Sequence, residues 1–265
     1  MNEKNDLVSA SLGSLTVRLA RDVNEVRAAQ RLRYEVFYEE MAAKADLDAA
    51  SSRLDRDPYD EICDHLLVLD ADLDGDGVVG TYRLLRGEIA EQHGGFYSRD
   101  EYDLSQLVSE SERSGLRLLE LGRSCVRADY RTNPVVQLLW RGIHQYIIHH
   151  DIGLLFGCAS LHGTEPKDLA LPLSFLHQSC LAPPAWRAKA IAERYVNMNI
   201  LDEVVSMKMA LPQLPPLIKG YLRLGGYIGE GAVVDHQFNT TDVLIILLME
   251  NVPDRYQQHF ERWDS

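Results

Sequence analysis

The sequence has few cysteines, no long apolar run and no excess of positive charge. Its four cysteines include no CxxC pair, a pattern that suits neither a disulfide scaffold nor a zinc site and fits a reducing compartment. The longest apolar run, VLIILLM at 243–249, is far shorter than the ~20 residues of a membrane-spanning helix. A formal net charge of −13 repels phosphate backbones, so we expect no nucleic-acid partner.

The first fifteen residues, MNEKNDLVSASLGSL, lack the positively charged start and apolar core of a signal peptide. Together with the cysteine pattern, this predicts a cytoplasmic protein. It leaves open a peripheral contact with the inner face of the cytoplasmic membrane.

The composition is that of a globular protein. In 265 residues, 46% are apolar and 25% are charged, which is enough apolar material for a sizeable core. We predict a flexible tail over 1–14 and a single domain over 15–265, with an irregular proline-rich insertion around 182–216.

Apolar periodicity predicts an alternation of strands and helices. The predicted strands are 15–20, 65–70, 78–85, 117–127, 154–161, 231–239 and 240–250. The predicted helices are 22–41 with Asp22 as N-cap, 135–150, 169–181, 215–226 and 252–263, with short helices and loops between 86 and 115. This order indicates a mixed α/β domain around a central sheet.

Two short motifs have a metal-binding appearance. DADLDGDG at 70–77 matches the first half of an EF-hand loop, but Thr81 stands where that loop needs a glutamate. A hairpin turn between strands explains it better. The adjacent histidines of HHD at 149–151 suit a helix end facing solvent. We therefore expect no metal site.

The segment RLLELGRSCVRADYR at 117–131 reads as an interior strand, yet it contains Glu120 and Arg123. Arg33 and Arg83 also lie on apolar elements. Charges in such places are usually paired. One interpretation is a structural network whose further partners are Asp57, Asp60 and Asp64. The other is a polar functional site at the open edge of the sheet.

Five segments, taken in order, resemble the ornithine lipid N-acyltransferase family of the Gcn5-related N-acetyltransferase-like superfamily. They are LRYEVFYEEM, DPYDEICDHLLVLD, VVGTYRLL, LELGRSCVRADYR and LLWRGIHQYI. The sequence is also similar to acyl-homoserine-lactone synthases, which share an Arg-Tyr-x-Val-Phe helix, an Asp-x-x-Asp loop and a Glu-x-x-Arg strand. These correspond here to Arg33–Phe37, Asp57–Asp60 and Glu120–Arg123.

The resemblance implies a fold and an activity. The fold would be a mixed central sheet with flanking helices and a C-terminal elaboration, in which 117–127 and 154–161 splay apart around the donor's pantetheine arm. The activity would move a 3-hydroxyacyl chain from acyl carrier protein to the α-amine of an amino acid. Ornithine is the default acceptor, with glutamine and glycine left open. The alternatives are an acyl-homoserine-lactone synthase and a non-catalytic module that binds acyl carrier protein.

One departure from the superfamily concerns the donor. Enzymes that use acetyl-coenzyme A carry a glycine-containing turn whose N–H groups hold the pyrophosphate. Here the turn is RTNPVVQ, which has no glycine, and Pro134 has no N–H to donate. This favours acyl carrier protein, whose phosphopantetheine has a single phosphate, and implies no separate cofactor.

The resemblance also suggests residue roles. Glu120 is the first candidate base for the amine, with Asp60 or Asp57 as alternatives, and Arg123 completes the catalytic set. A backbone N–H near Cys125 or Val126 would stabilise the oxyanion. Phe37, Trp140 and Phe156 are acyl-channel or core residues, with core favoured, and Cys125 is expected to be a packing residue. The predicted substrate-binding set is Arg33, Phe37, Asp57, Asp64, Arg83, Ser124, Cys125 and Val126.

Two surfaces are predicted for partners. An acidic carrier protein needs basic docking residues, for which the candidates are Arg131, Arg141, Lys167, Arg187 and Lys189. The segment PAWRAKAIAERY at 184–195 is a candidate for the peripheral membrane contact, through Trp186.

Side chains alternate along a regular strand, so Glu120 and Arg123 would point to opposite faces. We predict a β-bulge near Gly122 that turns both toward one side.

Overall fold

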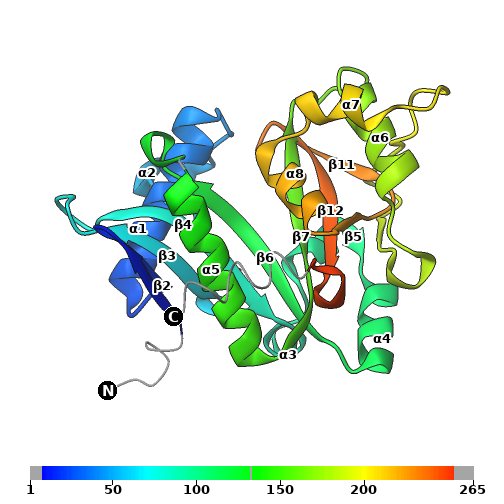
Figure 1. Cartoon of the computed structure of the whole chain (residues 1–265). Helices are drawn as coiled ribbons and strands as arrows, with labels where there is room; N and C mark the ends of the chain where they lie inside the picture. The colour runs from blue at the N-terminus through cyan, green and yellow to red at the C-terminus, as the bar shows by residue number, and fades with distance from the viewer. Residues whose placement is uncertain (1–7, 132, 254–265) are drawn as a thin grey trace. The chain divides into compact units, whose positions relative to one another are not determined.

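Figure 1 shows the computed structural model, which describes residues 8–131 and 133–253. These residues form two compact units that alternate along the chain. The first unit comprises 8–94, 121–131 and 133–152, and the second comprises 95–120 and 153–253. The sequence had predicted one domain from residue 15.

The first unit contains an antiparallel sheet. Its strands are β1 (Ser9–Leu12), β2 (Leu15–Leu19), β3 (Asp64–Asp70) and β4 (Val78–Arg86), hydrogen-bonded in that order, and β4 is followed by β6 (Arg117–Val126). The predicted strands over 15–20, 65–70 and 78–85 are confirmed. The 70–77 segment is the predicted hairpin turn, in which the Asp70 N–H donates to the Gly77 carbonyl at 2.8 Å.

Two helices cover opposite faces of this sheet because side chains alternate along β3. Leu67 packs with Ala29 and Leu32 of α1 (Val23–Tyr34). Leu66 points the other way, toward Gly142 of α5 (Asn133–His150). Figure 1 shows α5 running across the sheet. The core of the unit thus lies on both sides of β3.

Helix α1 begins where the sequence predicts. Asp22 accepts hydrogen bonds from the N–H groups of Asn24 and Glu25, as an N-cap should. The helix then changes at Glu35–Glu40 into a π-helix, a wider form often found at functional sites. The segment between this helix and β3 contains α2 (Leu47–Ser52) and a 3₁₀ turn, Pro58–Glu61.

The second unit is built around two long strands. Strand β7 (Ile152–His162) pairs antiparallel with β12 (Thr240–Leu248) from Leu154↔Leu248 to His162↔Thr240. In the sheet, β12 also pairs with β11 (Ala232–Asp235), and β11 pairs with β9 (Tyr195–Val196). β10 (Tyr227–Ile228) pairs with β12 as well. A separate pair joins β5 (Tyr102–Asp103) to β8 (Lys189–Ala190).

Short helices complete the two units. The first unit contains α3 (Gly87–Gln92), and the second contains the 3₁₀ turn Tyr97–Asp100, α4 (Ser105–Ser114), α6 (Ala170–Cys180), α7 (Met207–Ala210) and α8 (Pro216–Arg223). The predicted helices over 135–150, 169–181 and 215–226 are confirmed. The insertion around 182–216 consists of β8, β9, α7 and three-residue turns at Pro184–Trp186 and Leu211–Gln213.

The predictions for the two ends of the chain have different outcomes. The predicted flexible tail is wrong for 9–12, which form β1 against β2; residues 1–7 lie outside the described part. The predicted final helix falls mostly on 254–263, also outside it. Within 8–131 and 133–253, no helix is both long and apolar enough to cross a membrane.

Candidate active site

A buried network of three arginines and three aspartates lies in the first unit. Its centre is Arg33 on α1, whose side chain is completely enclosed. Arg33 Nε donates to Asp55 Oδ2 at 2.8 Å, and its Nη2 donates to both carboxylate oxygens of Asp60 at 3.0 and 2.9 Å. Arg33 therefore ties the chain before β3 to the first helix.

The other two arginines come from neighbouring strands. Arg83 on β4 donates to Asp57 at 2.7 Å and to Asp60 at 3.3 Å. Arg123 on β6 donates to Asp55 at 3.1 Å and to Asp57 at 3.2 Å. The formal charges of the six side chains cancel, which is the condition for keeping them buried.

The network changes the acidity of its members. Burial alone would raise the pKa of Asp60, but Arg33 and Arg83 outweigh it and hold that pKa well below its usual range. Burial lowers the pKa of His65, with Arg33 opposing its charged form, so this imidazole is neutral. The neutral ring donates from Nε2 to the Asp60 carbonyl at 2.9 Å.

The structure therefore contains an arginine–aspartate network, with one correction to the predicted members and one addition. Asp64 is not a member: it accepts from Tyr146 Oη at 2.7 Å and lies 3.9 Å from Arg86 Nε. Asp55 is a member that the sequence reading missed. It stands two residues before the recognised Asp-x-x-Asp motif, in the acidic run DRDPYD.

The backbone is irregular where the bulge was predicted. Arg123 has φ +50°, the left-handed region that a regular strand does not use. This departure follows Gly122 directly and frees Arg123 from strict alternation. The convergence of Glu120 and Arg123 on one side of β6 stays a prediction.

Glu120 belongs to the second unit and is held by a short turn. It is buried, and its Oε2 accepts the Tyr97 N–H at 2.8 Å. Its Oε1 accepts from the Ser98 N–H at 2.7 Å and the Ser98 hydroxyl at 2.6 Å. These three donors fix the position of the carboxylate.

Cys125 and Phe156 are interior residues, as expected. Cys125 is buried against Leu32 and Leu67 in the core beneath α1, and burial raises the pKa of its thiol well above the ordinary value. Phe156 on β7 is buried and makes an edge-to-face contact with Phe96, with ring centroids 4.8 Å apart. Phe37 packs against the edge of the core that contains Cys125.

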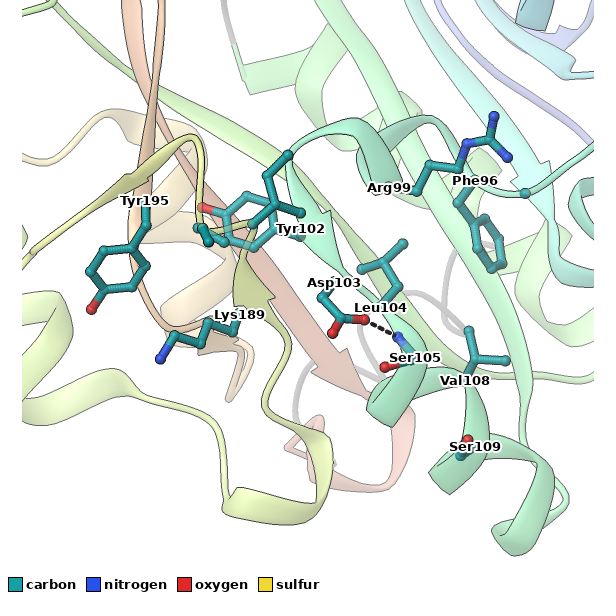
Figure 2. A pocket seen from close by; sticks show the side chains of 14 residues that line it. Phe96, Arg99, Tyr102, Asp103, Leu104, Ser105, Val108, Ser109, Lys189 and Tyr195 are labelled. Atoms are coloured by element: carbon teal, nitrogen blue, oxygen red, sulfur yellow. Dashed lines mark hydrogen bonds between the residues drawn. The ribbon is translucent and has the colours of Figure 1, made fainter.

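A largely apolar cavity of about 1170 Å³ lies in the second unit, around α4 and β8. Figure 2 shows Tyr195 and Lys189 at one end of the view and Phe96 and Val108 at the other. The cavity also meets Leu104, Ala190 and Ile191. Its size and lining suit a flexible hydrocarbon chain.

The five predicted docking residues differ in their surroundings. Arg131 is ion-paired with Glu40, and Lys189 with Glu230. Arg187 donates to the Ala182 carbonyl at 2.8 Å. Lys167 is exposed and Arg141 is half-buried on α5. Docking of a carrier protein on these residues stays a prediction.

The remaining candidates are less informative. Ser124 and Val126 are half-buried on either side of Cys125, and Trp140 is half-buried on α5. Trp186 is half-buried in a three-residue turn, not on an extended amphipathic helix.

A family model and a solved structure identify the fold class of this protein. Residues 32–141 match the model of the acetyltransferase (GNAT) domain. The structure is similar to that of FeeM, an N-acyl amino acid synthase from uncultured soil microbes. The TM-score is 0.50 at 12% identity, covering 89% of this chain and 91% of that one. The fold is therefore of the Gcn5-related N-acetyltransferase type, a mixed α/β acyltransferase fold.

Closer relatives define the family. The chain is 48% identical over 258 residues to the L-ornithine N(alpha)-acyltransferase of Brucella abortus, covering 96% of this chain and 91% of that protein. It is 47% identical over 262 residues to the enzyme of the same name from Agrobacterium fabrum, covering 97% and 89%. The chain belongs to the L-ornithine N(alpha)-acyltransferase family.

Proposed function

We propose that this protein transfers a 3-hydroxyacyl chain from acyl carrier protein to the α-amine of ornithine, forming a lyso-aminolipid. The observation that carries the proposal is the 47–48% identity, over nearly the whole chain, to proteins named L-ornithine N(alpha)-acyltransferase. No comparable observation favours a lactone synthase or a non-catalytic carrier-binding module.

The reaction needs a proton acceptor for the amine, and the geometry favours Glu120 over Asp60. The pKa of Asp60 is held low because Arg33 and Arg83 stabilise its charged form more than burial opposes it. A carboxylate stabilised in this way is a weak base. Glu120 accepts from the Tyr97 N–H and from the N–H and hydroxyl of Ser98, which hold its carboxylate in a fixed position.

The proposed step is an acyl transfer. The amine nitrogen attacks the thioester carbon, a C–N bond forms, and the C–S bond breaks. The amine proton passes to Glu120 and from there to the departing pantetheine thiolate. A backbone N–H near Cys125 or Val126 would stabilise the oxyanion that forms during the attack.

The arginines have a supporting role in this proposal. Each of Arg33, Arg83 and Arg123 is bonded to the loop that carries Asp55, Asp57 and Asp60. They would keep that loop in place beside the substrates, and Arg123 is also a candidate for the acceptor's carboxylate.

The apolar cavity around α4 and β8 supports a fatty acyl chain as the transferred group. Phe96, Leu104, Val108 and Ile191 give it an apolar lining suited to a fatty chain. The choice of donor rests on the turn 131–137, which has no glycine to approach a pyrophosphate.

The test is an assay of purified protein with 3-hydroxyacyl carrier protein and single amino acids. We expect release of one thiol for each N-acylornithine identified by mass spectrometry, and much slower turnover with the same chain on coenzyme A. Formation of a homoserine lactone, or no thiol release with any amino acid, would refute the assignment. Equal rates with coenzyme A would refute the choice of donor.

A further inference from the structure

Three carboxylates gather at one place in the second unit. Glu101 precedes β5, Asp235 ends β11, and Asp242 lies on β12, and oxygens of all three lie within 4.8 Å of one another. Glu101 is 6% exposed and Asp242 is 7% exposed. Three carboxylates so close together repel each other in their charged forms, so the cluster is stabilised either by holding a proton or by a cation.

The cluster contains less positive charge than negative charge. Within residues 8–131 and 133–253, the cation ion-paired with the cluster is Arg194, whose Nη2 lies 3.2 Å from Glu101 Oε1 and whose side chain is 35% exposed. Asp242 Oδ1 is buried and has no hydrogen-bond partner within the described residues. A buried carboxylate oxygen without a donor costs free energy, so its place beside two further acids points to a cationic ligand.

The acidity of the cluster agrees with this charge count. Burial raises the pKa of Glu101 to about 7, and the Asp242 charge adds to the effect. Burial also raises the pKa of Asp242. The Ser160 side chain beside Asp242 and Arg194 beside Glu101 lower these pKa values without cancelling the effect of burial. A donor that carries positive charge would therefore stabilise both carboxylates.

A cavity of about 680 Å³ leads to this cluster. Glu101, Asp235 and Arg194 line it, and so does Tyr97. The Tyr97 N–H donates to Glu120, the proposed base. The cavity thus has two of the three acids, Glu101 and Asp235, along one part of its wall and a direct neighbour of the base along another.

Side chains also connect the cluster to Glu120. The Ser98 hydroxyl donates to Glu120 at 2.6 Å. Cys158 Sγ lies 3.5 Å from that hydroxyl oxygen and 3.1 Å from Glu101 Oε2. Only two side chains, Ser98 and Cys158, separate the base from the acids, a span suited to an acceptor with one amine at each end.

We propose that Glu101, Asp235 and Asp242 bind the side-chain ammonium of the acceptor and thereby select a diamino acid over a neutral amino acid. The inference rests on the proposed function, which supplies the α-amine at Glu120. An alkylammonium has three N–H donors, one for each carboxylate, and its positive charge balances the cluster.

A divalent metal ion fits the same place less well. Calcium and magnesium need six or more oxygen ligands. Both oxygens of Glu101 already have partners, Arg194 and Cys158, and Asp235 Oδ1 accepts two backbone N–H groups. The Arg194 guanidinium, 3.2 Å from Glu101 Oε1, would also repel a doubly charged ion more strongly than a singly charged ammonium.

The experiment compares ornithine with norvaline, which has the same carbon chain but no terminal amine. Binding is measured by calorimetry on the purified protein without donor, and KM is measured with 3-hydroxyacyl carrier protein. We expect ornithine to bind at least tenfold more tightly than norvaline. Asp242→Asn and Asp235→Asn should reduce that ratio to nearly one. The matched control Asp202→Asn removes an exposed acid and should keep the full ratio.

Several outcomes would overturn the inference. One is an unchanged ratio in both cluster variants although their urea unfolding curves show that they are folded. Another is stoichiometric binding of Ca²⁺ or Mn²⁺ that Asp242→Asn abolishes. If the wild-type protein releases no thiol but prefers ornithine through Asp242, the proposed function fails and the ammonium site stands. If it neither binds nor acylates ornithine, both fail.

Discussion

Arg33 Nε donates to Asp55 Oδ2 at 2.8 Å with both side chains enclosed, at 0% and 4% exposure. Arg33 is on the first helix and Asp55 is in the loop before β3, so the bond fixes two segments of the first unit. Because no solvent replaces a lost partner there, the pair gives a direct measure of what the network contributes.

Arg33→Lys should destabilise the first unit by about 3–5 kcal/mol, because an ammonium cannot bond Asp55 and Asp60 in the same fork geometry and leaves a buried charge poorly paired. The measurement is the free energy of unfolding in urea. The control is Arg31→Lys on the same helix, whose exposed pair with Asp76 should change stability by less than about 1 kcal/mol. Equal losses in the two variants would contradict the prediction.

The lowered pKa of Asp60 predicts how the stability of the protein falls in acid. Its folded pKa lies below the ordinary aspartate value of 3.8 because its arginine partners outweigh burial. A depressed folded pKa stabilises the protein fully above the unfolded pKa and loses that effect as pH falls through the folded value. Urea unfolding between pH 5 and 2 should therefore show a steeper loss of stability in the wild type than in Asp60→Asn. Parallel curves would argue against the shift.

Much of this fold follows from the sequence. The segments HLLVLD and VVGTYRLL predicted two strands, and they pair as β3 and β4 because apolar β-formers with a glycine-rich turn between them leave few alternatives. Asp22 marked the start of α1 for an equally local reason. The π-helix at Glu35–Glu40 was missed, because it depends on hydrogen bonds such as Met41 N–H to the Val36 carbonyl, which residue types do not specify.

Some site residues could be predicted from the sequence, and others could not. Arg33, Arg83 and Arg123 were found because charges on apolar elements stand out in a sequence. Asp242 also lies on an apolar strand, yet its companions are Glu101, just before β5, and Asp235, at the end of β11, which lie far from one another along the chain. Only the folding of the second unit brings the three together, so no spacing rule would have revealed them.

Glu101→Gln should change how stability depends on pH. Burial and Asp242 raise the pKa of Glu101 from 4.5 to about 7. A raised folded pKa favours the folded state fully below pH 4.5, and this effect is lost as pH rises through 7. The wild type should lose on the order of 1–3 kcal/mol between pH 5 and 8 from this group, and Glu101→Gln should lose less. A saturating concentration of ornithine should flatten the wild-type curve, because bound ammonium favours the ionised carboxylate.

Glu120→Gln should lower kcat by about 10²–10⁴-fold at neutral pH, because the amide keeps the shape of the side chain but accepts no proton. The deficit should narrow as the pH is raised, since more of the amine is then already deprotonated. The control Glu112→Gln removes an exposed charge on α4 and should leave the pH profile unchanged. Near-normal turnover of Glu120→Gln at neutral pH would exclude Glu120 as the base.

Two helical glycines provide a test of the packing. A Cβ at Gly142 of α5 would lie 2.8 Å from a methyl of Val17 and 2.9 Å from one of Leu66, whereas one at Gly220 of α8 would meet nothing within 4 Å. Alanine gains about 1 kcal/mol of helix propensity over glycine at either site, but overpacking at Gly142 costs about 1–3 kcal/mol. Gly220→Ala should therefore raise the urea midpoint, and Gly142→Ala should be less stable than it by about 2 kcal/mol. If both variants were stabilised equally, α5 would not pack on Val17 and Leu66 as closely as the structure has it.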